Sequence, residues 1–258
     1  MRNFLNRKIQ FIQKNYLKHT DFFKTFDINQ HSAYNIRDKD HRSVYYCDKN
    51  IPQELSPLLI KYFDNKLITK ELIMGRLNRS WRIISAKHAY RAFKRLENTN
   101  RKITPIIYSI INFKKLFLTK KSIQFQEYIA NSTTFETYFN SLTDNKFKLA
   151  IVNSLADILS LCHMKKVFII DFGKDFEHFI VKDDNPYIID LDETILLNPL
   201  NILSLHYQIY DLTIVLKKIK NICGKNSTEA FFQKYSENLK WSYFRTKIYY
   251  KYFKKFMI

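Results

Sequence analysis

Apolar positions along this chain fall either into short runs or into longer stretches with helical spacing. The short runs are rich in β-branched and aromatic residues and predict strands at 43–47, 58–63, 106–111 and 122–129. Helical spacing predicts helices at 67–97, 147–163 and 210–222. In the second of these, Ile151, Leu155 and Ile158 share one face. Gly224 is expected to cap the third helix.

An acidic cluster is bracketed by three further apolar runs, at 167–170, 179–181 and 187–189. The polar residues that follow these runs are Asp171, Asp175, Glu177, His178, Asp190 and Asp192. Carboxylates and an imidazole gathered at strand ends suit a site that holds a metal ion beside a reacting hydroxyl. The alternative is structural: the aspartates close strands and turns, the other loop charges are solvated and His178 is packed.

A lysine interrupts the apolar run at 58–63. One interpretation places this strand at a sheet edge, with the Lys61 ammonium in water. The other interpretation directs Lys61 at the phosphates of a nucleotide. The pattern by itself leaves both open.

Composition narrows the classes of function. The 258 residues have a net charge of +19, which indicates an anionic partner such as nucleic acid, a phosphorylated substrate or a membrane surface. Only three glycines occur, so G-x-G-x-x-G and Walker A loops are excluded. The three cysteines are far apart, which argues against a disulfide framework. We expect no signal peptide and no transmembrane segment, because no apolar run is long enough.

Basic side chains gather in two segments. Arg76, Arg79 and Arg82 share a helical face, which is either solvated or in contact with phosphate or anionic lipid. Residues 239–258 interleave lysines and an arginine with aromatic residues and contain no acid. This tail either packs its aromatics on the domain, or lies on an anionic membrane with its lysines toward the headgroups.

The order of these elements resembles that of the protein-kinase fold, and specifically that of the bacterial lipopolysaccharide core kinases, which phosphorylate heptose or Kdo sugars. Three stretches carry the resemblance: LLIKYF with GRLNRSWRIISAKHAYRAFKRL, LADILSLCHMKKVFIIDF, and HFIVKDDNPYIIDLDE. The resemblance implies an α+β, two-lobed protein-kinase-like fold with a small β-rich N-lobe and a mainly helical C-lobe. The implied domains are a basic N-terminal extension (1–40), the N-lobe (41–130) and the C-lobe with its basic aromatic tail (131–258).

The same resemblance gives roles to individual residues. Lys61 would pair with the phosphates of ATP, and Asp190 would hold the Mg²⁺ that bridges them. His178 occupies the place of a metal-binding asparagine, although Mg²⁺ prefers oxygen ligands. Backbone groups near Glu127 and Ile129 would contact adenine.

The catalytic base is assigned to Asp171, with Asp175 as the alternative. In the kinase motif H-R-D-x-x-x-x-N the aspartate lies five residues before the metal ligand. Asp171 lies seven residues before His178 (178 − 171 = 7), so the loop is expected to be two residues longer.

Three other positions affect this interpretation. Asp211 resembles a buried aspartate that braces the catalytic loop. His163 is interpreted as a helix-end residue favoured by the helix dipole. Ala89 stands where a glutamate normally pairs with the strand lysine, and neither Glu71 nor Glu97 is well placed by sequence to replace it.

Together these inferences predict an ATP- and Mg²⁺-dependent kinase for a heptose or Kdo sugar of the lipopolysaccharide inner core. The expected partners are that acceptor and an anionic membrane surface, bound peripherally from the cytoplasm at the inner membrane, with no nucleic acid. One alternative is a kinase-fold protein that acts on another acceptor. Another is an inactive pseudokinase that binds anionic partners.

Overall fold

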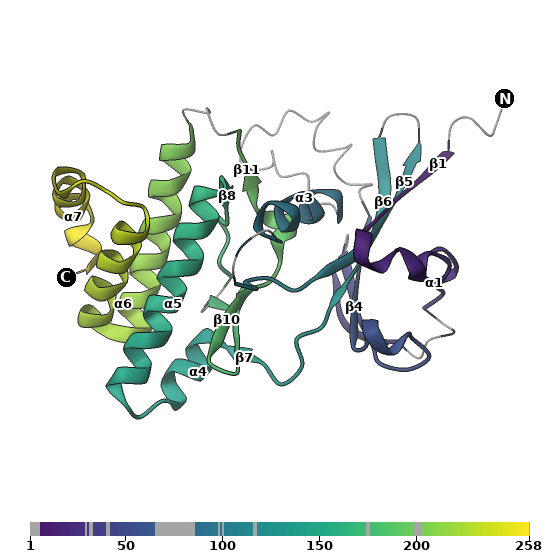
Figure 1. The fold of residues 1–258 in the computed structure, drawn as a ribbon, viewed down its shortest axis with the longest axis horizontal. Helices are drawn as coiled ribbons and strands as arrows, with labels where there is room; N and C mark the ends of the chain where they lie inside the picture. The colour runs from purple at the N-terminus through teal and green to yellow at the C-terminus, as the bar shows by residue number, and fades with distance from the viewer. Residues whose placement is uncertain are drawn as a thin grey trace. The chain divides into compact units, whose positions relative to one another are not determined.

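The computed structural model describes residues 6–28, 30, 33–39, 42–64, 86–97, 99, 101–115, 118–173, 176–198 and 203–257. The chain folds into two compact units (Figure 1). The first comprises Met1–Lys94 and Pro105–Ala130, and the second comprises Arg95–Thr104 and Asn131–Ile258.

The first unit is built on a six-stranded antiparallel sheet with the strand order β1-β5-β6-β4-β3-β2. Its strands are β1 (Asn6–Ile12), β2 (Tyr34–Lys39), β3 (Arg42–Cys47), β4 (Leu58–Asp64), β5 (Ile107–Lys115) and β6 (Leu118–Glu127). Its helices are η2 (Lys14–His19), α1 (Thr20–Thr25), η3 (Gln53–Leu55) and α3 (Ala86–Glu97). The four strands predicted in this part of the chain are confirmed as β3 to β6, with shifted ends.

The two faces of this sheet differ in chemistry. On one face Leu58 and Ile60 of β4 pack with Phe125 of β6 and Phe23 of α1 in an apolar core. The other face carries Lys61 beside Gln124, its cross-strand partner on β6. Alternation along β4 produces this division, because successive side chains of a strand point to opposite faces.

Two predictions for the first unit need correction or limitation. Residues 1–40 were expected as an extension, but β1 and β2 are the two edge strands of the sheet. The signal was weak because NRKIQFI pairs with β5 through its backbone, and its polar residues do not alternate strictly with apolar ones. Of the helix predicted at 67–97, only α3 is described, and the three arginines at 76, 79 and 82 lie outside the described residues.

The second unit is mainly helical. Its helices are α4 (Phe135–Ser141), α5 (Asn145–Met164), η5 (Leu191–Glu193), α6 (Leu203–Asn238) and α7 (Tyr243–Met257). Its short strands are β7 (Thr133–Thr134), β8 (Val167–Phe168), β9 (Phe179–Lys182), β10 (Asn185–Ile188) and β11 (Ile195–Leu196). The helix α5 begins where Asp144 accepts a hydrogen bond from the Lys146 N–H at 2.7 Å, a capping contact. Its predicted apolar face is confirmed, and this face packs against α6.

The prediction that a helix ends at Gly224 is confirmed, because the stretch labelled α6 consists of two helices that meet in a kink at this residue. Gly224 has φ 81° and ψ 176°, so it interrupts the helical backbone, but α6 resumes at once and continues to Asn238. In the first turn after the kink, Thr228 Oγ1 donates to the Gly224 carbonyl at 2.8 Å. The fold class is as predicted: an α+β protein with a β-rich first unit and a mainly helical second unit.

Candidate active site

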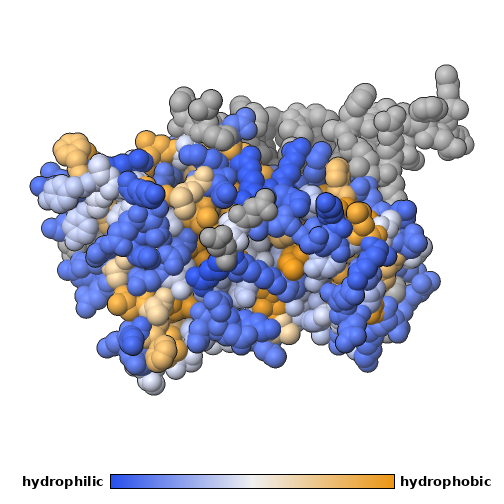
Figure 2. Space-filling view, viewed as in Figure 1, coloured by the Kyte–Doolittle hydropathy of each residue, from blue (hydrophilic) through white to orange (hydrophobic). Residues whose placement is uncertain are grey.

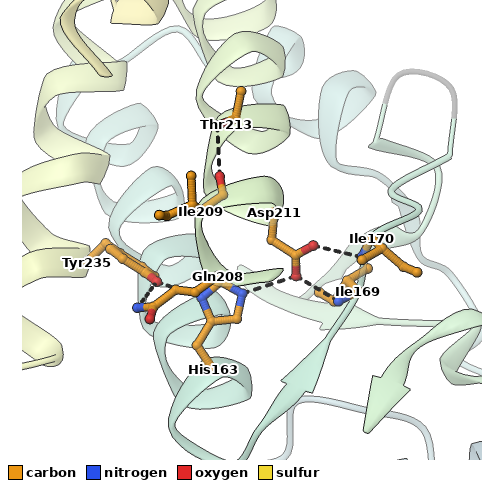
Figure 3. Close-up of polar contacts among 8 residues, drawn as sticks. All are labelled: His163, Ile169, Ile170, Gln208, Ile209, Asp211, Thr213 and Tyr235. Carbon is orange, nitrogen blue, oxygen red and sulfur yellow. Dashed lines mark hydrogen bonds and ion pairs between the residues drawn. The ribbon is translucent and has the colours of Figure 1, made fainter. Parts of the chain in front are cut away.

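A buried carboxylate holds the backbone that leads into the acidic loop (Figure 3). Asp211 of α6 accepts hydrogen bonds from the Ile169 N–H at 2.8 Å and from the Ile170 N–H at 2.9 Å. His163 of α5 adds a third contact, from Nε2 to Asp211 Oδ2 at 3.1 Å. Asp211 has no exposed surface, so these donors offset the cost of removing its carboxylate from water. Asp211 therefore braces the 169–170 backbone, as the resemblance implies.

The second nitrogen of His163 extends this network to the far half of α6. Nδ1 lies 2.6 Å from the Tyr235 hydroxyl, and this hydroxyl accepts a hydrogen bond from Gln208 Nε2 at 2.9 Å. We assign the tyrosine proton to a bond with His163 Nδ1, which leaves the imidazole proton on Nε2, facing Asp211. Burial raises the pKa of Tyr235, so its proton is retained at neutral pH.

The interpretation of His163 as a simple helix-end residue is therefore corrected. Its side chain is buried and belongs to the brace, because His163 lies on the side of α5 that faces α6. One sequence signal was available: His163 lies four residues after Leu159, which is buried on the core-facing side of α5.

Asp171 opens the loop and is half-buried. Its Oδ1 accepts a hydrogen bond from the Gly173 N–H at 3.0 Å. Its backbone carbonyl accepts a hydrogen bond from His178 Nδ1 at 2.9 Å. Asp171 and His178 are therefore in direct contact, although they lie seven positions apart in the sequence. Asp175, the alternative base, lies outside the described residues.

His178 and Asp190 face each other across the ends of β9 and β10. His178 Nε2 lies 3.7 Å from Asp190 Oδ2. The hairpin fixes this placement, since the Ile189 N–H donates to the His178 carbonyl at 2.9 Å. Because His178 Nδ1 donates to a carbonyl, the neutral ring carries its lone pair on Nε2, toward Asp190.

This pair fits a magnesium ion as a partial ligand set. Mg²⁺ is commonly held by one or two carboxylates, with phosphates and water completing the shell, so Asp190 with an accessory His178 nitrogen is a compatible donor set. Within the described ranges, no group of three His, Cys, Asp or Glu side chains gathers as a closed metal site.

Lys218 is a residue of this loop region that sequence reasoning missed. Its Nζ donates to the Gly173 carbonyl at 2.7 Å and lies 5.6 Å from the centroid of the Phe176 ring. Lys218 lies seven residues after Asp211, two helical turns along α6, so both side chains lie on the same side of the helix. That spacing was the signal available in the sequence.

Glycine is required at the centre of the loop. Gly173 has φ +68°, and a Cβ at this position would lie 3.1 Å from His178 Cδ2 and 3.2 Å from Glu177 Cβ. A side chain here would displace the His178 ring. Below the loop, Phe172, Phe176 and Phe179 form a fully buried cluster that anchors it in the second unit.

The other predicted site residues belong to the first unit. Lys61 is only 2% exposed and lies on β4, between β3 and β6. The edge-strand alternative is therefore wrong, because β4 has a hydrogen-bonded neighbour on each side. A lysine buried in an inner strand requires polar surroundings, and Gln124 beside it is polar.

Glu127 and Ile129 lie at the end of β6 and just beyond it. The Glu127 N–H donates to the Ile106 carbonyl at 2.8 Å, and its carboxylate accepts from the Ile106 N–H at 3.0 Å. These contacts hold the end of β6 against the residue that precedes β5. Ala89, in the place of the expected glutamate, is fully buried on α3.

Comparison with known proteins supports the fold. No protein-family model matches the chain, and no curated protein matches it by sequence. The solved structure of WaaP in complex with acyl carrier protein is similar to this structure, with a TM-score of 0.68 and 13% sequence identity over 96% of each chain. The alignment includes both units, so the likeness is not confined to the helices or to the sheet. The chain therefore shares the fold of WaaP.

Proposed function

We propose that this protein is an ATP-dependent kinase that phosphorylates a heptose or Kdo sugar of the lipopolysaccharide inner core. The observation that carries the proposal is the arrangement of Asp171, His178 and Asp190 around one loop, whose backbone Asp211 braces. The fold shared with WaaP, a lipopolysaccharide core heptose kinase, supports the same function.

In this proposal Asp190 and His178 hold Mg²⁺. When bound, the ion would neutralise charge on the phosphates of ATP. Lys61 would pair with the same phosphates, and backbone groups at Glu127 and Ile129 would contact adenine. Catalysis would come mainly from positioning and charge neutralisation, as in other phosphoryl transfers.

Asp171 is proposed to accept the proton of the sugar hydroxyl, or to orient it. Its carboxylate is positioned by the Gly173 N–H, and its backbone is tied to His178. A base held beside a metal ligand can align the hydroxyl with the γ-phosphorus. Asp175 stays the alternative assignment.

Charge and fold together support the proposed acceptor class. A chain with a net charge of +19 suits a negatively charged acceptor, and the lipopolysaccharide inner core is anionic and anchored in a membrane. We propose that the enzyme works from the cytoplasm at the inner membrane. A kinase for another acceptor is the second candidate. A pseudokinase is the third, favoured by the buried Ala89 in place of the usual glutamate.

Mass analysis of lipopolysaccharide from cells with and without this protein tests the reaction and the acceptor together. The expected result is one phosphate fewer on the core when the protein is absent, restored by the wild-type chain but not by Asp190→Ala. An unchanged core rules out this acceptor. Mg²⁺-dependent ATP binding and turnover by the purified protein then separate a kinase for another acceptor from a pseudokinase.

A further inference from the structure

The inner side of α7 packs against the rest of the second unit. Phe253 is completely buried and lies 6.0 Å, centroid to centroid, from Phe232 of α6. Tyr249 stacks on Trp241 at 4.6 Å, and Arg245 lies over the same Trp241 ring at 4.9 Å. The inner side of α7 therefore belongs to the core of the second unit. This packing determines which residues of α7 point outward.

The outer side of α7 exposes large apolar and aromatic residues. Tyr243 is 82% exposed, Phe244 72% and Ile248 51%. Tyr252, also half exposed, follows Phe244 and Ile248 at four-residue intervals, so these three lie along one stripe of the helix. Apolar and weakly polar side chains are visible among hydrophilic ones at the end of the molecule where α7 lies (Figures 1 and 2).

Lysines run beside this stripe. Lys247, Lys251 and Lys254 are exposed and follow each other at intervals of four and three residues. No acidic residue occurs from 239 to 258, so no carboxylate of α7 offsets their charge. An aromatic stripe flanked by an uncompensated basic row combines the two features of an interfacial helix: an apolar side and a cationic edge.

We infer that the outer side of α7 binds the surface of an anionic phospholipid bilayer. Phe244, Ile248 and Tyr252 enter the boundary between headgroups and acyl chains, while the lysine stems extend their ammonium groups to the phosphates. A bilayer suits these residues better than a folded protein partner does, since they lie on one helix and provide charge of one sign only.

The mode of binding is peripheral. Among the described helices, only α5 is long and apolar enough to cross a membrane, and half of that stretch is buried inside the second unit. This inference extends the proposed function by naming the element that brings the enzyme to its acceptor. It also stands on α7 alone, and its test needs no phosphoryl transfer.

Co-sedimentation of the full-length protein with vesicles tests the inference. With vesicles of mixed phosphatidylcholine and phosphatidylglycerol, the wild type is expected to sediment. With pure phosphatidylcholine, or at high salt, it is expected to stay largely in solution, because screening weakens the lysine contacts. The triple variant Phe244→Ser/Ile248→Ser/Tyr252→Ser should lower the vesicle partition coefficient by about tenfold or more, given the apolar area lost.

A second variant and a matched control make the result decisive. Lys247→Gln/Lys251→Gln/Lys254→Gln should bind both vesicle types equally weakly. Phe147→Ser/Leu149→Ser removes two comparably exposed apolar residues from α5 and should leave partitioning unchanged. Circular dichroism confirms folding of each variant. The inference is overturned if the α7 variants sediment like the wild type, or if the α5 control loses as much binding. If vesicle binding behaves as expected while the lipopolysaccharide core is unchanged in cells, only the proposed function fails.

Discussion

The network around Asp211 and the Lys61 face of the sheet are both buried and polar, but their hydrogen bonds are completed differently. Around Asp211, two backbone N–H groups, His163, Tyr235 and Gln208 satisfy one another within the second unit. On the Lys61 face, Asn112 Nδ2 and Oδ1 and Gln124 Oε1 are buried and have no hydrogen-bond partner in the described part of the chain. Asn112 joins this face because it pairs across the strands with Ser122, the partner of Phe63.

This difference separates two uses of buried polarity. A network whose donors and acceptors are all matched fixes geometry at little net cost. A buried amide without a partner costs about 1–3 kcal/mol, which a polar ligand could recover. The first pattern suits a scaffold that holds Asp171 in place. The second suits a surface that is completed by a bound nucleotide, in agreement with the proposed role of Lys61.

Removing the brace should have the largest effect. Asp211→Ala leaves two backbone donors and His163 without their acceptor, so we expect a loss of about 3–5 kcal/mol in the free energy of unfolding. Chemical denaturation with urea measures this loss. A change below about 1 kcal/mol would show that the 169–170 backbone is held by other contacts.

Removing the carboxylate of Asp190, the proposed metal ligand, should lower activity strongly and leave stability nearly intact. Asp190→Ala is expected to lower phosphoryl transfer by about 10²- to 10⁴-fold, because charge on the phosphates is no longer neutralised. Asp171→Asn should lower phosphoryl transfer by a similar factor if Asp171 is the base. Glu177→Gln, an exposed carboxylate of the same loop, is the matched control and should be close to wild type. Full activity of both aspartate variants would contradict the site assignment.

A smaller effect is expected from removing the Tyr235 hydroxyl, which lies at the end of the network away from Asp211. Tyr235→Phe keeps the buried ring but removes the hydroxyl that bonds His163 and Gln208. We expect a loss of about 1–2 kcal/mol in stability, because the buried His163 and the half-buried Gln208 each lose a partner. The double variant Tyr235→Phe/Asp211→Ala should cost less than the sum of the single variants, since both act on His163. Additive losses would mean that the two ends of the network are independent.

Lys218→Met tests the loop itself. The stem remains over Phe176 while the bond to the Gly173 carbonyl is lost. We expect kcat to fall by about tenfold with a stability change below about 1 kcal/mol, because the bond positions the loop and contributes little to the core. Lys225→Met on the same helix is exposed and serves as the control. Equal effects of the two lysine variants would assign the loss to surface charge.

The two regions also differ in how far the sequence predicts them. The strand containing Lys61 and the helix α5 follow from local periodicity, whereas the proposed roles of Asp171, His178 and Asp190 come from the resemblance to the kinases. The His163–Tyr235 contact joins residues 72 positions apart, and no local pattern encodes it. The unpaired state of Asn112 likewise depends on cross-strand packing. Sequence reasoning therefore proposes which residues would carry the chemistry, but it misses the long-range contacts that hold their backbone in place.

The smallest effect, and the sharpest test of the comparison, lies on the Lys61 face. Asn112→Leu replaces the two unpaired buried polar atoms with methyl groups and keeps the same branched heavy-atom skeleton, so the protein without nucleotide should be unchanged or more stable by up to about 1–2 kcal/mol. Gln126→Leu on the same face should instead destabilise, since Gln126 Oε1 is the acceptor for Gln124 Nε2. Urea denaturation of both variants with and without ATP separates the cases: Asn112→Leu should reduce the stabilisation that ATP provides. If Asn112→Leu destabilises the nucleotide-free protein as much as Gln126→Leu does, Asn112 is paired in solution. The Lys61 face would then be a completed scaffold like the Asp211 network.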